Sequence, residues 1–508
     1  MKFCKVADSI DWQDPDFQAA AARLNLGNSK NRKFWEYLQV YAGLAKLGML
    51  DGTRRALGLG VGSECLIYAF TEVCQAVVAT DLYQSTQWST AAMSVEAVYE
   101  HPRPYRRDRL TVQHMDMTRI EYPDASFDFV WSCCAIEHVH NFQALHQVYQ
   151  EIHRVLKPGG IAALTTEFNV TNLPSYEPNL LFTDQAWMNA WLTGDNPLIQ
   201  GFEFLDTPDY RVTPLAENEP LPRRSPDDSI QIYCNDIILN SVSFFLRKLE
   251  TPLAPYTETW LPEFWHRYLR GCDELRDGDP AGAEITLQSL LQTPGLEPRL
   301  KVRTARRLAQ ALNKQDKLEK LRRLCEDILP DCERFADEDH FMVLANYCLK
   351  LDMLEPAKFL FAKVEKLPGS LPETILKSLM GQAQACELQG DHDHAFDRLD
   401  KAIQWATTEP ALGHYAPKLT YKQGMIQEKL GNLEMAIALY QEVINLTAPG
   451  SEFHTKGYRR LTACLQIQVR QLQRKVKQLE SNPGWIQRNQ LDNLRTPINS
   501  LKRFLKRN

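Results

Sequence analysis

The chain has 508 residues, of which 44% are hydrophobic and 24% are charged, and its net charge is −6. These proportions are ordinary for a folded globular protein, and a chain this long exceeds a single hydrophobic core, so we expect about two to four domains. No stretch approaches the run of about 18 apolar residues that a membrane span needs.

The first residues and the cysteines indicate a reducing compartment. The opening MKFCKVADSIDWQDPDF has acidic and polar residues where a secretory signal would have an apolar run. Twelve cysteines are scattered along the chain, with Cys133 and Cys134 adjacent and no CxxC pair, which disfavours a zinc ribbon or a thioredoxin-type site. We therefore expect a cytoplasmic protein with buried thiols.

Charge is distributed unevenly. Residues 456–508 contain 13 lysines and arginines but only two acids, a charge of +11, which leaves −17 on the rest of the chain. A basic tail on an acidic body favours contact with an acidic partner, a membrane surface or the body itself.

Short apolar runs alternate with amphipathic stretches from Arg54 to Lys248. Helix 142–155 is well marked, because Asn141 can cap it and its apolar residues form one stripe before KPGG ends it. This alternation predicts a doubly wound α/β sheet. The predicted strands are 55–60, 75–81, 110–116, 127–133, 160–168, 201–208 and 241–248.

Beyond Lys248 the pattern becomes helical. Three prolines mark a linker over 251–263, and no strand pattern follows it. A small-residue and turn pattern then recurs over 264–450 at spacings of 37, 37, 38 and 41, which favours an all-α helical-repeat solenoid. The anchors of these repeats are Ala283, Lys320, Ala357, Ala395 and Ala436.

The last repeat and the helix after it have distinct patterns. Gly424, Gly431, Ala436 and Tyr440 resemble a tetratricopeptide repeat (TPR), so the solenoid is expected to be TPR-like. Helix 452–480 has apolar residues at alternating steps of four and three, a seam that favours packing on another helix. We expect it to cap the solenoid, so that residues 451–508 form a capping helix and a basic C-terminal tail, with dimerisation through this helix as the alternative.

The stretch GLGVGSE, residues 58–64, does not fit a dinucleotide fingerprint, because the third glycine is absent in either frame. Asp81 ends the next strand, 21 residues beyond Gly60, where it can accept hydrogen bonds from two ribose hydroxyls. Asp116 ends the third strand, where it can hold the amino group of an adenine, and the neighbouring Met117 can lie against the ring. The fourth strand leads into a loop that contains Glu137 and His138.

In order and spacing, this set over residues 30–248 resembles the class I S-adenosylmethionine-dependent methyltransferases. The resemblance implies a Rossmann-like, seven-stranded sheet in a domain over 1–250, S-adenosylmethionine as cofactor, and no metal. Gly58 stands where the family usually has an acid, so Glu64 or the preceding helix is expected to contact the amino group of the cofactor. The cofactor residues implied are Gly58, Gly60, Gly62, Asp81, Asp116, Met117, Ser132 and Glu137.

Methyl transfer from a sulfonium requires positioning above all, and a base only if the acceptor must lose a proton. His138 is the predicted base, with His140 behind it, although many enzymes of this family use none. An aromatic insertion over 172–194 is expected to shape the acceptor pocket with Tyr176, Trp187 and Trp191. A glycan hydroxyl, a small metabolite and a protein side chain remain open as acceptors.

Two functions of different classes follow. The first is an active methyltransferase whose TPR-like repeats recruit the acceptor or a protein partner. The second is a methyltransferase-like scaffold without turnover, in which the repeats carry the function as a protein-binding module. Nucleic acid is disfavoured as a partner, because the tail has few aromatic residues and the body is acidic.

Overall fold

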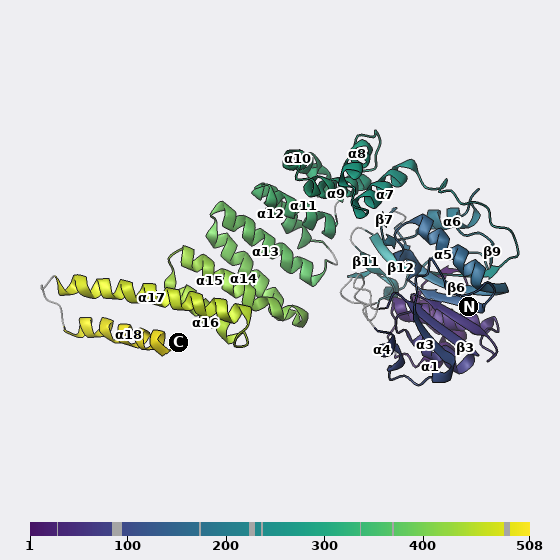
Figure 1. Cartoon of the computed structure of the whole chain (residues 1–508), viewed down its shortest axis with the longest axis horizontal. Helices are drawn as coiled ribbons and strands as arrows, with labels where there is room; N and C mark the ends of the chain where they lie inside the picture. The colour runs from purple at the N-terminus through teal and green to yellow at the C-terminus, as the bar shows by residue number, and fades with distance from the viewer. Residues whose placement is uncertain are drawn as a thin grey trace. The chain divides into compact units, whose positions relative to one another are not determined.

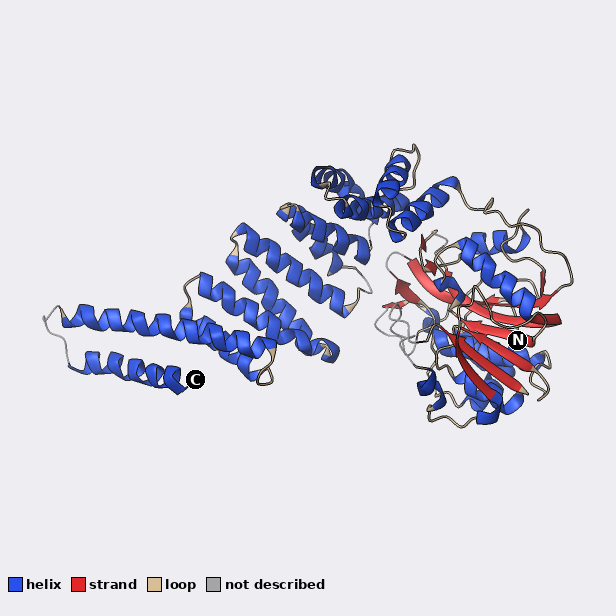
Figure 2. Cartoon of the chain, in the orientation of Figure 1, coloured by secondary structure: helices blue, strands red, loops and turns tan. Residues whose placement is uncertain are grey.

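The computed structural model describes residues 1–27, 29–83, 94–171, 174–222, 229–234, 237–335, 337–367, 370–481 and 488–507. The chain divides into two compact units, Met1–Lys317 and Leu318–Asn508. The predicted methyltransferase boundary at 250 therefore does not coincide with the boundary of the first compact unit, which also contains three helices beyond the linker. Among the described residues, all strands belong to the first unit (Figures 1 and 2).

A twisted sheet with a parallel centre organises the first unit. Its five parallel strands lie in the order β4-β3-β2-β5-β6, so the chain starts in the middle and winds outward. The long strand β12 pairs antiparallel with β6, Leu246 opposite Ala162. The bounds are β2 Arg55–Leu59, β3 Ala76–Asp81, β4 Leu110–His114, β5 Phe127–Cys133, β6 Leu156–Asn169 and β12 Ile237–Lys248.

The described sheet has ten strands, and not the seven that the resemblance implied. Three short strands lie along the outer edge of β12: β11 (Ile232–Cys234), β1 (Lys5–Val6) and β9 (Phe202–Phe204). The two-residue strand β10 (Leu221–Pro222) extends β11. The sequence predicts β9 within 201–208, whereas β1, β10 and β11 have only two or three residues each and give no periodic signal. Together these short strands cover backbone groups that an edge strand would leave unpaired.

Helices cover both faces of the sheet. Helices α1, α2 and α3 pack with strand residues such as Phe129 and Trp131 in one buried core. Helix α5 begins as predicted, since the Asn141 side chain accepts a hydrogen bond from the amide of Ala144, and it packs against β6. The bounds are α1 Pro15–Leu24, α2 Arg32–Lys46, α3 Cys65–Val73, α4 Val95–Tyr99, α5 Phe142–Val155 and α6 Gln185–Thr193.

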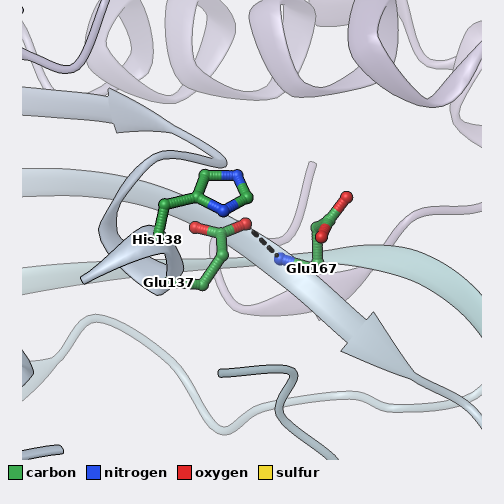
Figure 3. A group of neighbouring side chains, drawn as sticks. All are labelled: Glu137, His138 and Glu167. Atoms are coloured by element: carbon green, nitrogen blue, oxygen red, sulfur yellow. Dashed lines mark hydrogen bonds between the residues drawn. The ribbon is translucent and has the colours of Figure 1, made fainter. Parts of the chain in front are cut away.

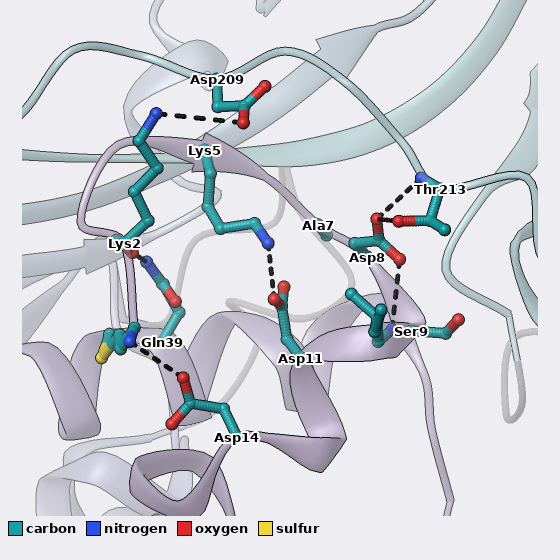
Figure 4. Close-up of polar contacts among 12 residues, drawn as sticks. Lys2, Lys5, Ala7, Asp8, Ser9, Asp11, Asp14, Gln39, Asp209 and Thr213 are labelled. Atoms are coloured by element: carbon teal, nitrogen blue, oxygen red, sulfur yellow. Dashed lines mark hydrogen bonds and ion pairs between the residues drawn. The ribbon is translucent and has the colours of Figure 1, made fainter.

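A polar network connects the N-terminal segment to the loop around Thr213 (Figure 4). The buried carboxylate of Asp8 accepts hydrogen bonds from the amide of Thr213 at 2.7 Å and from the Asn218 side chain at 2.8 Å. Lys5 forms an ion pair with Asp11, in the turn that precedes α1. Segments about 200 residues apart in sequence are thereby held together.

Helices α7 to α9 belong to the first unit, and α7 and α9 contact the aromatic insertion. Tyr176, in the small hairpin of β7 (Tyr176–Glu177) and β8 (Leu180–Leu181), contacts the rings of Trp187 and Trp265. The predicted linker has no helix until α7 begins at Glu263. The bounds are α7 Glu263–Arg276, α8 Pro280–Leu291 and α9 Pro298–Lys314.

The described part of the second unit is helical, and from α11 onward successive helices lie side by side (Figure 1). The predicted anchors Ala357, Ala395 and Ala436 are fully buried, whereas Lys320 is exposed and its neighbour Leu321 is buried instead. The bounds are α10 Leu318–Phe335, α11 Glu338–Lys350, α12 Leu354–Val364, α13 Pro372–Gln389, α14 His392–Thr408, α15 Ala416–Lys429 and α16 Leu433–Asn445.

Two long helices end the chain. Helix α17 (Glu452–Glu480) spans the predicted residues, and its seam residues Val469 and Val476 pack with Ile498 of α18 (Arg488–Arg507). The basic tail is therefore largely a helix, which gives the seam a partner within the chain. In the parts of the chain that the structure describes, no helix combines the length and apolar character that a membrane crossing requires.

Candidate active site

A cavity of about 1030 Å³ opens where the parallel strands end. Loops that follow β2, β3, β4 and β5 line it, together with the first turn of α2. Ligands of open α/β sheets bind at this edge. The cavity brings together six of the predicted site residues: Gly60, Gly62, Asp81, Asp116, Met117 and His138.

The glycine turn after β2 brings bare backbone to the cavity. Gly60 and Gly62 have φ angles of +64° and +47°, which disfavour residues with a Cβ. A Cβ on Gly60 would lie 2.4 Å from the Cβ of Ala135 and 3.2 Å from the methyl carbon of Met117. Any side chain at position 60 would therefore fill space between this turn and the loop after β5.

Asp81 closes the other side of the turn. One carboxylate oxygen accepts a hydrogen bond from the amide of Gly62 at 2.8 Å, and the other accepts one from the amide of Leu82 at 2.7 Å. Burial raises the pKa of Asp81 above its ordinary value, against these two bonds. Each oxygen keeps a further lone pair, and the residue lines the cavity, so the carboxylate is placed to accept from a ligand.

Asp116 lies at the rim of the cavity and is exposed. Its Oδ1 accepts hydrogen bonds from both the amide and the hydroxyl of Thr118, each at 2.8 Å. This turn leaves Oδ2 available, with the neighbouring Met117 inside the cavity.

Gly58 and Ser132 lie behind the cavity wall, so their predicted contact with a cofactor is not supported by their positions. A Cβ on Gly58 would lie 2.4 Å from the indole ring of Trp131, so this glycine makes room for a buried tryptophan. The Ser132 hydroxyl donates to the carbonyl of Leu59 at 2.8 Å and is fully buried. Both residues contribute to the packing of β2 against β5.

Glu64 lines the cavity, and the pKa of its carboxyl group is raised. Its Oε1 accepts a hydrogen bond from the indole nitrogen of Trp131 at 2.5 Å, and only 9% of the residue is exposed. Burial raises the pKa of Glu64 to about 8, although the nearby Lys33 opposes the shift. The carboxyl group is therefore mostly protonated at neutral pH.

Sequence reasoning missed the charges that α2 brings to the cavity. Arg32 and Lys33 both line it. They pair with the fully buried Glu36, at 3.3 Å and 2.9 Å. Burial opposes the ionisation of Glu36, but the two cations outweigh it and hold its pKa below the ordinary value. No local motif marks these residues, since only the packing of α2 over the strand ends places them here.

The loop after β5 brings an imidazole and two carboxylates together (Figure 3). His138 lines the cavity, and its Nδ1 lies 3.0 Å from the carbonyl oxygen of Asn179. Glu137 is buried beneath it, and its Oε1 accepts a hydrogen bond from the amide of Glu167 at 2.9 Å. Burial raises the pKa of Glu137. His140 and Glu167 also line the cavity, whereas Glu137 does not.

The predicted aromatic wall of the acceptor pocket lies elsewhere. Tyr176, Trp187 and Trp191 are buried and are not among the residues that line the cavity. They pack in a cluster with Phe142 and Trp260. Their role is to hold the insertion on α5 and on the segment before α7, and the insertion reaches the cavity through Asn179.

Comparison with known proteins finds a family match within the first unit. Residues 57–164 match the methyltransferase domain family. The match covers β2 through most of β6, which includes the glycine turn, Asp81, Asp116 and the His138 loop. This part of the chain is a methyltransferase-type α/β domain, and the match covers neither the strands beyond β6 nor the helical region.

Two curated relatives align over short stretches. The chain is 42% identical over 57 residues to the 27-O-demethylrifamycin SV methyltransferase of Amycolatopsis mediterranei, covering 11% of this chain and 20% of that protein. It is 33% identical over 112 residues to the "Probable S-adenosylmethionine-dependent methyltransferase" of Mycolicibacterium smegmatis, covering 22% and 42%. The chain thus spans less than half the length of these relatives.

A solved structure, the S-adenosylmethionine-dependent methyltransferase of Mesorhizobium loti, aligns with 22% identity and a TM-score of 0.20. That alignment covers 25% of this chain and 53% of the other. At this level the likeness adds nothing to the assignment.

Proposed function

We propose that this protein is a class I methyltransferase that binds S-adenosylmethionine in the cavity at the strand ends and transfers its methyl group to an acceptor. One observation carries the proposal. The glycine turn, the partly buried carboxylate of Asp81 and the pair Asp116–Met117 all line one cavity. The family match over 57–164 and the names of the aligned relatives support it.

The lining residues fit the parts of this cofactor. Gly60 and Gly62 leave room for it at the turn, since a Cβ on Gly60 would fill the space beside Met117. In the proposal Asp81 accepts the ribose hydroxyls, and Asp116 and Met117 hold the adenine. Glu64 takes the cationic amino group, the role left open by the glycine at position 58. Arg32 and Lys33, which line the same cavity, are candidates for the carboxylate.

When bound, the cofactor supplies an activated methyl group on a sulfonium. The chain then has to exclude water, orient the acceptor and remove its proton where it carries one. His138 is the proposed base, because its imidazole lines the cavity and the carbonyl of Asn179 fixes the position of its Nδ1. The acceptor remains a glycan hydroxyl, a metabolite or a protein side chain.

The helical region is proposed to recruit the acceptor or a protein partner as a TPR-like solenoid. Buried small residues support it: a Cβ on Gly424 would lie 2.6 Å from the ring of Tyr440, as expected where two helices of a repeat cross closely. The alternative is a scaffold without turnover, in which these helices carry the whole function. An intact Asp81 that lines an open cavity favours the active enzyme.

A substitution in the glycine turn tests the proposed cofactor site. We expect Gly60→Ala to weaken S-adenosylmethionine binding at least tenfold in calorimetric titration, because its Cβ would clash with Ala135. Gly159→Ala is the matched control. Gly159 has a similar φ of +70°, but no atom lies within 4 Å of the added Cβ and the residue does not line the cavity. Thermal unfolding of both variants reports the shared backbone strain, about 1–2 kcal/mol.

Two results would count against the proposal. The first is wild-type protein that is folded and does not bind S-adenosylmethionine. The second is equal affinity for Gly60→Ala and Gly159→Ala, which would place the cofactor away from the turn.

Binding of the cofactor should release a proton near pH 7. Glu64 is mostly protonated at that pH because its pKa is about 8. A cationic amino group beside it would favour the ionised form and lower that pKa, so the proton leaves. Titration in two buffers of different ionisation enthalpy should give different observed heats at pH 7, where the amino group of the cofactor is already mostly protonated. In Glu64→Gln the buffer dependence should disappear, and its persistence there would show that another group releases the proton.

A further inference from the structure

Two side chains that line the cavity, His138 and Glu167, form a set of metal-ligand type with the buried Glu137. Glu137 and His138 come from the short helix η3 (Ile136–His138), and Glu167 comes from the end of β6. One donor atom from each lies within 4.8 Å of the other two. Figure 3 shows the imidazole over the carboxylate of Glu137, with the carboxylate of Glu167 to the side.

The spacing suits a single ion. Metal–ligand bonds to carboxylate oxygen and imidazole nitrogen are about 2.0–2.2 Å, so two donors on one ion lie at most about 4.4 Å apart. Donors that already lie within 4.8 Å need only small side-chain movements to converge. Two carboxylates and one imidazole form a donor set used for divalent cations such as Mn²⁺.

A buried oxygen supplies the second, independent observation. Glu137 is only 1% exposed. Its Oε1 is engaged by the amide of Glu167, whereas Oε2 has no hydrogen-bond partner among the residues that the structure describes. A buried carboxylate oxygen without a partner is costly, and a cation beside it removes that cost.

The neighbouring cations do not neutralise both carboxylates of the set. Arg32 pairs with one oxygen of Glu167 at 2.9 Å, so this guanidinium balances one of the two carboxylates. Lys33 pairs with Glu36, which lies outside the set. The carbonyl oxygen of Asn179, 3.0 Å from Nδ1 of His138, is a hydrogen-bond partner of the imidazole and orients it.

We propose that Glu137, His138 and Glu167 bind a divalent cation of the Mn²⁺ or Mg²⁺ class, which holds a hydroxyl oxygen of the methyl acceptor. This inference rests on the proposed function and narrows the acceptor to an oxygen nucleophile. On the ion the hydroxyl loses its proton to solvent. Its oxygen forms the new bond to the methyl carbon, and the sulfur–carbon bond breaks with its electron pair left on sulfur. His138 then acts as a ligand and not as a base.

The test uses full-length protein freed of metal with a chelator. We expect Mn²⁺ to bind at one site per chain. Binding is measured by the loss of the electron paramagnetic resonance signal of free Mn²⁺. Replacing a residue that only orients a metal ligand typically weakens binding by about 10–100-fold, so Glu167→Gln and His138→Asn, which remove ligands, should each weaken it at least tenfold. His140→Asn is the matched control, because His140 lines the same cavity but is outside the set, and it should keep the wild-type affinity.

Calorimetric titration of each variant with S-adenosylmethionine separates the two proposals. Retained cofactor binding with lost Mn²⁺ binding supports the metal site and shows that the variants fold. Cofactor binding without Mn²⁺, Mg²⁺ or Zn²⁺ binding in the wild type overturns the metal site and leaves the methyltransferase proposal standing. Mn²⁺ affinity unchanged in Glu167→Gln and His138→Asn would also overturn it.

Discussion

Asp81→Asn is expected to weaken S-adenosylmethionine binding about 100-fold. In the proposed site this carboxylate accepts two ribose hydroxyls, and a hydrogen bond to a charged group contributes about 1.5–3 kcal/mol. Losing about 3 kcal/mol corresponds to about two powers of ten in the dissociation constant. Calorimetric titration of wild type and variant measures the difference directly.

The same substitution should leave the free protein nearly as stable as the wild type. Burial raises the pKa of Asp81, so the ionised group is disfavoured in the fold without ligand, and a neutral amide avoids that cost. The amide still has an oxygen for one of the two backbone donors, Gly62 or Leu82. A fall in affinity without a matching fall in melting temperature would therefore locate the effect in binding.

Asp116→Asn provides the comparison within the cavity. Asp116 is exposed and one of its oxygens is already engaged by Thr118, so we expect less than about tenfold loss of affinity for this single solvated bond. Equal losses in Asp81→Asn and Asp116→Asn would contradict the assignment of Asp81 to the ribose.

Glu177→Gln is expected to destabilise the first unit by about 3–5 kcal/mol, the usual cost of removing one partner from a buried ion pair. Glu177 lies in β7 with a side chain that is 15% exposed, and three guanidinium groups of α9 surround it. Tyr268 of α7 also donates to it at 2.6 Å. The amide would leave the charges of Arg303, Arg306 and Arg307 together without their shared counter-ion.

The pH dependence of this effect has a definite sign. Burial opposes ionisation of Glu177, but the arginines outweigh it and hold its pKa far below the ordinary value. A depressed pKa stabilises the fold above the pKa of the unfolded state, about 4.3, and this contribution is lost as the pH falls toward the folded value. The gap in melting temperature between wild type and Glu177→Gln should therefore be full at pH 7 and narrow below about pH 4.

An exposed pair serves as the control. Glu203 pairs with Arg247 at 2.8 Å, and both side chains are about 45% exposed. Glu203→Gln should change the unfolding free energy by less than about 1 kcal/mol, as exposed pairs do. If Glu177→Gln were no more harmful than Glu203→Gln, the arginine cluster would not be what fixes β7 to α9.

Features with a local signal were predictable from the sequence. The seven predicted strands lie on strands of the structure, with ends that differ by a few residues, and the Asn141 cap and the helix 452–480 match closely. Each depends on periodicity or on a cap within one element. From the order of the motifs we could expect Gly60, Asp81 and Asp116 near one another, and all three line one cavity.

Features that depend on packing were not predictable. Gly58 and Gly60 are equivalent in a motif, but the indole of Trp131 occupies the space above one and the cavity lies above the other. Arg32 and Glu167 meet across 135 residues of sequence, with no motif around either. Lys320 was assigned as a repeat anchor from spacing alone, whereas its apolar neighbour Leu321 is the residue that packs.

The short strands along β12 also affect how the protein is made. Lys5 and Val6 pair with Ser243 and Val242, so strand β1 has no partner strand until more than 200 further residues have left the ribosome. Contacts between residues so far apart form slowly, because a long loop must close first. After β12 has been synthesised and before these loops have closed, β12 and its partner strands expose unpaired backbone groups that other chains can pair with. The completion of this edge is therefore expected to be the slow and aggregation-prone step in the biogenesis of the first unit.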